Sequence, residues 1–130
     1  MSSIPHIPAV RRGRPYQSLD NITVRDHRTG EGKATISSVN TGIIRKDLQR
    51  IDESRAALKK FTVKELIDIC AKAGDLFLNG TLPLGDNGRT QTLQHYVETL
   101  SATSGLPHVL LKRNMAKIHQ ALANMKMVLT

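Results

Sequence analysis

The sequence predicts an α+β fold in which an extended arm and one β-hairpin precede about four α-helices. Residues 22–39 alternate apolar and polar side chains around a glycine-containing turn, which is the pattern of half-buried strands. Residues 41–130 repeat apolar side chains every three or four positions, which is the pattern of helices buried on one face. The chain therefore divides into an arm, 1–20, and a hairpin with helices, 21–130.

The arm is expected to be extended, basic and poorly packed before Tyr16. Its prolines exclude regular helix and hold the residues before them extended. A solvated or docking role for its arginines is favoured over nucleic-acid binding, because only Tyr16 is present to stack on a base. The prolines are Pro5, Pro8 and Pro15, and the arginines are Arg11, Arg12 and Arg14.

The hairpin places Ile22 and Val24 on one face of its first strand, and Ala34 and Ile36 on one face of its second. The turn spans residues 27–31. A two-stranded hairpin is only marginally stable in water, so these strands need another layer of protein. We expect chain outside these 130 residues to supply that layer, and the hairpin to lie outside any closed sheet.

The first helix is predicted to run from a cap at Asn40 or Thr41 to about Lys60, because either side-chain oxygen can accept hydrogen bonds from a first helical turn. One face should be buried, since its apolar residues form a single stripe. The stripe consists of Ile44, Leu48, Ile51, Ala57 and Leu58, closed by Phe61.

A second helix begins at Thr62, which forms the capping box T-x-x-E with Glu65. It ends at Asn79 and Gly80, since glycine permits the left-handed conformation that terminates many helices. Its apolar face consists of Val63, Leu66, Ile67, Cys70, Ala73 and Phe77.

Residues 80–89 contain three glycines and a proline and are predicted to form a surface loop. A short helix then starts at Thr90 or Thr92, and Gly105 and Pro107 separate it from the last helix. The last helix has one continuous apolar seam, typical of packing along a neighbouring helix. The seam still runs at the end of the sequence, so we expect a longer polypeptide. Its residues are Leu111, Met115, Ile118, Leu122, Met125 and Leu129.

Positive charge is concentrated at the two ends of the chain, whose formal net charge is +8. Residues 1–19 and 99–130 contain seven lysines and arginines and no acidic residue. This distribution suits a nucleic acid or another anionic surface, and equally an acidic surface in a longer chain.

The sequence predicts a cytoplasmic protein with no membrane partner. The single cysteine, Cys70, excludes an internal disulfide and is typical of a reducing compartment. No apolar run approaches the roughly 18 residues of a membrane span, and the first residues lack the features of a secretory signal.

No catalytic, cofactor-binding or metal site is predicted. His108 and His119 could share a helix face, but eleven residues place them about 16 Å apart, too far for one metal ion. Cys70 lies on an apolar helix face, where the reactive thiolate is disfavoured. The motifs G-x-x-x-x-G-K-[ST] and G-x-G-x-x-G are absent.

The order of elements resembles the amino-terminal part of the aldehyde dehydrogenase superfamily over residues 22–107. Those enzymes open with a hairpin whose turn reads T-G-E, followed by two amphipathic helices and a later glycine-proline turn. The chain departs from the family in lacking a proline before the turn and a tryptophan at the end of the first helix. Its tail is closer to branches that include acyl-CoA reductases. The corresponding stretches are Arg28–Glu31, Ala34–Ser37, the helices ending at Phe61 and Asn79, and Ser104–Pro107, and the tail is Lys112–Thr130.

The resemblance implies that residues 21–130 are the truncated N-terminal part of a cofactor-binding domain in a larger Rossmann-like α/β fold. The parent would be an NAD(P)-dependent oxidoreductase in which a downstream cysteine attacks an aldehyde or acyl thioester and hydride is exchanged with nicotinamide. This segment would be a scaffold without catalytic residues that binds neither NAD nor NADP itself. Its partner would be the remainder of its own polypeptide, in a parent that could form a homo-oligomer.

Two other functions remain open. One is a small basic helical module that binds nucleic acid, with affinity dominated by phosphate contacts. The absence of a helix-turn-helix or another groove-reading motif counts against it. The other is a module that pairs with another protein through the seam of the last helix.

Overall fold

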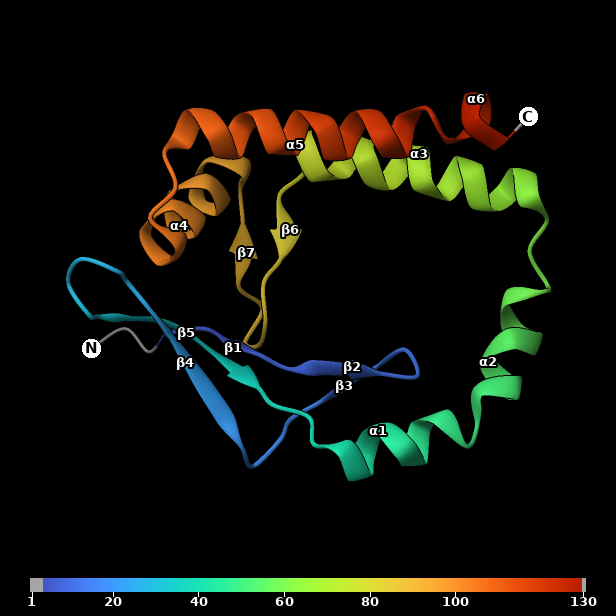
Figure 1. The fold of residues 1–130 in the computed structure, drawn as a ribbon, viewed down its shortest axis with the longest axis horizontal. Coiled ribbons are helices and arrows are strands. Elements are labelled where there is room, and N and C mark those ends of the chain that lie inside the picture. Colours follow the sequence, from blue (N-terminus) through green and yellow to red (C-terminus); the bar gives the residue numbers. More distant parts are fainter. Residues whose placement is uncertain (1–3, 130) are drawn as a thin grey trace.

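Residues 4–129 of the computed structural model contain six helices and three small sheets (Figure 1), so the predicted mixed α+β class is confirmed. The strands are β1 (His6–Ile7), β2 (Ala9–Arg11), β3 (Arg14–Tyr16), β4 (Asn21–Arg25), β5 (Gly32–Ser37), β6 (Leu82–Pro83) and β7 (Thr90–Gln91). The helices are α1 (Thr41–Leu48), α2 (Ile51–Leu58), α3 (Val63–Asn79), α4 (Leu93–Ser104), α5 (His108–Ala123) and α6 (Met125–Leu129).

The predicted hairpin is β4–β5, with Val24 opposite Ala34 and Ile22 opposite Ile36. The hairpin lies outside any closed sheet, but the expectation that only chain beyond these 130 residues supports its strands is wrong. The arm supplies β1, which pairs parallel to β5 and completes a three-stranded sheet in the order β1-β5-β4. Pro5 and Pro8 explain why, because the extended backbone they favour is also the conformation that an edge strand requires.

The rest of the arm also forms regular structure, although none of residues 4–16 is buried. Residues 1–3 of the segment predicted to be poorly packed lie outside the described residues. β2 and β3 form an antiparallel hairpin in which Arg11 lies opposite Arg14. Arg12 and Gly13 make the two-residue turn, with φ of 51° and 76°. Positive φ at both positions is the signature of a type I′ turn, whose twist matches that of the flanking strands.

The loop between β6 and β7 holds β1 in place. The N–H of Asp86 donates to the carbonyl oxygen of His6 at 3.1 Å, and the N–H of His6 donates to Oδ1 of Asp86 at 3.3 Å. Gly85 has φ +61°, and a Cβ added there would lie 2.2 Å from the His6 carbonyl oxygen. The predicted surface loop is therefore a clamp on the arm, and Gly85 permits its close approach.

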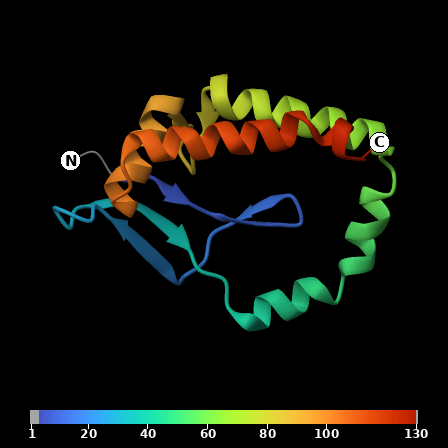
Figure 2. The same ribbon diagram turned by 45° about the horizontal axis from the view of Figure 1, so that its top comes forward.

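The predicted helix over residues 41–60 is two shorter helices, α1 and α2. Asn40 caps α1 as expected, accepting a hydrogen bond from the N–H of Ile43 at 3.0 Å. The helix is interrupted at Gln49 and Arg50, and no residue of α1 or α2 is buried. Without a surface to pack on, the apolar stripe supplies none of the tertiary stabilisation that long helices rely on. Figures 1 and 2 show α1 and α2 as a connection that leads from β5 to α3.

The core lies where α3, α4 and α5 meet. Val97 is fully buried, and Leu111 and Met115 are 3% and 2% exposed. Five half-buried residues surround them: Phe77, Leu78, Leu93, Tyr96 and Leu100.

The ends of the helices follow local capping chemistry. The capping box of Thr62 and Glu65 is present at the start of α3. The helix ends at Asn79 as predicted, but the predicted left-handed cap at Gly80 is wrong, because Gly80 is extended, with φ −83°, while its N–H donates to the Leu76 carbonyl. The predicted last helix is interrupted at Asn124, whose backbone N–H and side-chain Nδ2 both donate to the Gln120 carbonyl, at 3.1 and 2.8 Å. An asparagine that bonds back in this way competes with continued helix. The seam is therefore continuous in sequence but divided between α5 and α6, and Met127 and Leu129 remain exposed.

The chain exposes far more surface than a compact protein of its size. Its accessible area is 9849 Å², whereas a compact monomer of the same mass exposes about 6,800 Å². The apolar stripe of α1 and α2 contributes to this area, because its residues are open to solvent. Among residues 4–129, none of the helices combines the length and apolar character that crossing a bilayer requires.

Candidate functional site

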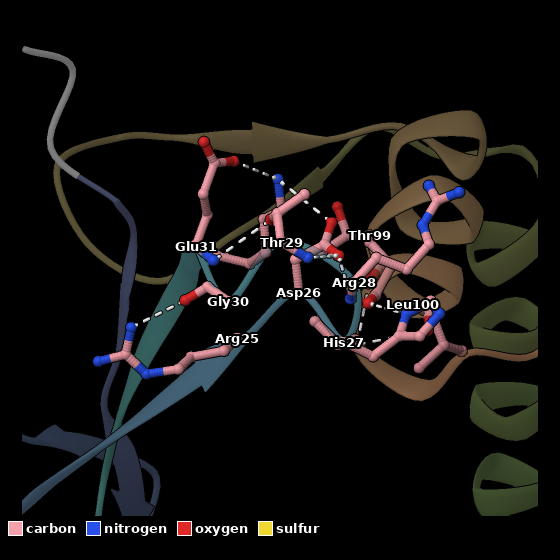
Figure 3. Close-up of polar contacts among 12 residues, drawn as sticks. Arg25, Asp26, His27, Arg28, Thr29, Gly30, Glu31, Thr99 and Leu100 are labelled. Carbon is pink, nitrogen blue, oxygen red and sulfur yellow. Dashed lines mark hydrogen bonds and ion pairs between the residues drawn. The ribbon is translucent and has the colours of Figure 1, made fainter.

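The hairpin turn of β4–β5 is anchored on the end of α4 (Figure 3). The carboxylate of Asp26 is buried and accepts hydrogen bonds from the N–H groups of Arg28 and Thr29, at 2.9 and 3.2 Å. These bonds hold the pKa of Asp26 below its ordinary value, with Lys33 adding a smaller effect. The backbone N–H of His27 donates to the Ala102 carbonyl at 2.8 Å. The turn that carries the family resemblance therefore has a structural role in this chain.

An apolar cleft of about 550 Å³ lies between the sheet and α4. Val24, Ala34 and Ile36 line it from the hairpin, so α4 covers part of the face that we expected other chain to cover. Its lining contains no nucleophile paired with a base. Lys33 faces Asp26 and Glu31 at 3.7 and 3.5 Å, which makes it a structural ion-pairing group.

A second cleft, also about 550 Å³, is strongly basic. It lies between the β2–β3 hairpin of the arm and α1. The ion pair between Arg11 and Asp47 joins these two elements. We call it the basic cleft. Its lining residues are Arg11, Arg12, Arg14, Pro15, Tyr16, Lys46, Asp47 and Arg50.

Two of these arginines hold the arm on the helices. Arg11 donates from Nε and Nη2 to the two carboxylate oxygens of Asp47, both at 2.7 Å, and its guanidinium lies 4.7 Å from the centre of the Tyr16 ring. Arg12 pairs with Glu53, which also receives two hydrogen bonds from Arg50, at 2.8 and 2.9 Å. The docking role predicted for the arginines is thus visible in their contacts.

The Arg11 contact makes the docking of the arm sensitive to acid. Its hydrogen bonds lower the pKa of Asp47 below the ordinary 3.8. Because the pKa is lowered in the folded state, the stabilisation is complete above pH 3.8 and is lost as the pH falls through the lowered value. The stability difference between the wild type and Asp47→Asn should therefore be constant near neutrality and vanish in strong acid, as followed by thermal unfolding. Asp52→Asn, at a carboxylate 94% exposed, is the control, and an equal effect there would contradict this role.

The histidines and the cysteine are not brought together. His6 bonds Thr35 and Ser37 at 2.8 and 3.0 Å and ties β1 to β5, a role with no signal in the sequence. His119 contacts Asp75 at 3.0 Å, while Cys70 is half-buried on α3. Within residues 4–129, no group of three histidine, cysteine or acidic side chains is placed to hold a metal ion.

The cations of the two chain ends do not line one common site. The basic cleft gathers the arginines of the arm with Lys46 and Arg50, and none of its lining comes from α5. Comparison with protein-family models, curated proteins and solved structures finds no match to this chain. The resemblance to aldehyde dehydrogenases therefore depends on the sequence motifs alone.

Proposed function

We propose that this chain is a scaffold segment of a larger oxidoreductase resembling NAD(P)-dependent aldehyde dehydrogenases or acyl-CoA reductases. The observation that supports a scaffold is the apolar surface left open on α1 and α2. Ile44, Leu48, Ile51, Leu58 and Phe61 are each about half exposed, between 47% and 58%. Exposed apolar surface of this kind, when it forms a patch, normally marks an interface with other protein.

The oxidoreductase part of the proposal comes from the T-G-E turn and the order of elements. The three-stranded sheet removes the main physical support that the hairpin gave to the expectation of missing chain, since the arm itself pairs with the hairpin. The exposed helical stripe is a separate argument and does not depend on the hairpin. In this proposal catalysis requires further polypeptide, because neither the apolar cleft nor the basic cleft is lined by a nucleophile paired with a base.

The stripe provides a test that compares two forms of the protein. Leu58→Glu should change the stability of the isolated 130-residue chain by less than about 0.5 kcal/mol, because Leu58 is 58% exposed there. In the protein made from the whole reading frame, the same substitution should place a charge in a buried interface and strongly reduce stability. Lys60→Glu, an exposed residue outside the stripe, is the matched control. Equal effects of Leu58→Glu in the two forms would contradict the scaffold.

The chemistry is tested separately. The isolated chain should neither bind nicotinamide cofactor usefully nor turn it over. The whole protein should reduce NAD(P) with an aldehyde or oxidise NAD(P)H with an acyl thioester, measured by absorbance of the reduced nicotinamide. Absence of turnover over a panel of aldehydes and acyl thioesters would overturn the oxidoreductase assignment and leave the scaffold test standing.

A nucleic-acid-binding module is the second candidate, supported by the basic cleft. Two of the arginines that would contact nucleic-acid phosphates already form ion pairs within the chain, Arg11 with Asp47 and Arg12 with Glu53. Their contribution to nucleic-acid binding is therefore reduced. The single aromatic ring in the cleft, Tyr16, is also occupied by Arg11. We therefore rank this function below the scaffold.

A further inference from the structure

We propose that the basic cleft binds a phosphate-bearing anion, with the diphosphate group as its best ligand. Five cationic side chains and one carboxylate line this cleft. Glu53 stands beside it and pairs with two of the cations, so three positive charges remain in excess. This inference is independent of the oxidoreductase proposal, because it uses residues of the arm, of α1 and of the start of α2, and none of the T-G-E turn.

The cations fall into two groups with different roles. Arg11, Arg12 and Arg50 are held by Asp47 and Glu53, which fixes the walls of the cleft. Arg14 and Lys46 also line the cleft, and no carboxylate of residues 4–129 lies within ion-pairing distance of either. They are the two groups from which an anion can gain a full new ion pair. A guanidinium fork and an ammonium together suit the oxygens of a phosphate.

The backbone of the arm gives a second, independent indication. Arg12 adopts φ 51° at the first central position of its turn. Asparagine, aspartate and glycine are strongly preferred there, because a larger side chain is strained at positive φ. Arg12 therefore occupies a position that local turn chemistry would give to another residue. Such strain is typical of functional positions, and in this chain it places a cation on the wall of the cleft.

The composition of the cleft also indicates which anion fits. A monovalent carboxylate would satisfy only one of Arg14 and Lys46, whereas a diphosphate carries enough charge for both. The cleft volume of about 550 Å³ lies in the range of small-molecule sites. Because the Tyr16 ring is covered by Arg11 at 4.7 Å, recognition of an aromatic base is not expected. The ligand is thus recognised by its phosphates.

Titration of the protein with inorganic pyrophosphate, followed by calorimetry, tests the proposal. One saturable site is expected, and its affinity should fall as salt is added. Arg14→Gln and Lys46→Gln should each weaken binding at least about tenfold, the loss of one charge-assisted contact. Lys60→Gln, which removes one charge outside the cleft, should change affinity less than about twofold. No saturable binding, or equal losses in all three variants, would overturn the proposal.

Arg12→Asn separates the anion site from a purely structural role for the turn. Asparagine is favoured at this turn position, so the variant should fold with an intact β2–β3 hairpin. Pyrophosphate affinity should nevertheless fall, and unchanged affinity would count against Arg12 as a wall of the site.

Titration with a short oligothymidylate in parallel shows whether the cleft also binds the phosphates of a polymer. Binding of both ligands with the same variant pattern assigns a phosphate site open to polymers, and binding of pyrophosphate alone assigns a small-molecule site.

Discussion

Replacement of Gly85 by alanine is expected to lower the free energy of unfolding by about 2–5 kcal/mol, the sum of a left-handed alanine and an overpacked contact. Gly85 has φ +61°, and its new Cβ would lie 2.2 Å from the carbonyl oxygen of His6. Backbone on both sides leaves no flexible side chain to move away. The loop must therefore separate from β1, and the arm should lose its pairing with β5.

Gly88→Ala is the matched control for this prediction. Gly88 lies in the same loop at φ +65°, but a Cβ there meets nothing within 4 Å. It should lose only about 1–2 kcal/mol from the left-handed conformation. Denaturant unfolding gives both values. Hydrogen exchange of the Thr35 N–H, which donates to the Pro5 carbonyl at 2.9 Å, should accelerate more in Gly85→Ala. Equal effects of the two alanines would show that the clamp is not needed.

Leu111→Ala is expected to destabilise the protein by about 2–5 kcal/mol, because it removes buried methyl groups and leaves a cavity. Leu111 is 3% exposed, and the core around it contains only two other fully or nearly fully buried residues, Val97 and Met115. So small a core cannot compensate for the loss by shifting other large side chains. The helical unit of α3, α4 and α5 should therefore unfold at markedly lower denaturant concentration.

Leu110→Ala is the neighbouring control. Leu110 precedes Leu111 on α5 but is 46% exposed, so its truncation should cost less than about 1 kcal/mol. Thermal unfolding of the two variants side by side measures the difference. If Leu110→Ala proved as damaging as Leu111→Ala, the core would have to lie on another face of α5.

Local chemistry made several elements predictable from the sequence. Thr62 and Glu65 form the expected capping box, and Asn40 caps α1. The alternation of apolar and polar residues predicted the two strands β4 and β5, while their pairing, with Val24 opposite Ala34, comes from the structure. These features depend on interactions between residues that are close in the chain, so they can be predicted from the sequence alone.

The candidate site was less predictable. The three arginines of the arm were visible as a cluster, but Lys46 and Arg50 join them only because β2–β3 docks on α1 through Arg11 and Asp47. From the sequence, the positive charge of the two chain ends was expected to suit an anionic surface or an acidic surface in a longer chain. The tertiary structure places the charge of the arm beside α1, since a bidentate ion pair joins Arg11 and Asp47, 36 positions apart.

The sequence by itself determined the caps at Asn40 and Thr62, the two strands of the hairpin and the mixed class of fold, because each follows from short-range backbone and side-chain preferences. Only the tertiary structure decided that the arm becomes strand β1, that residues 84–89 clamp it, and that α1 and α2 stay uncovered. Those outcomes depend on where distant segments meet. His6 finds Asp86 across 80 residues, and no local pattern specifies such a contact.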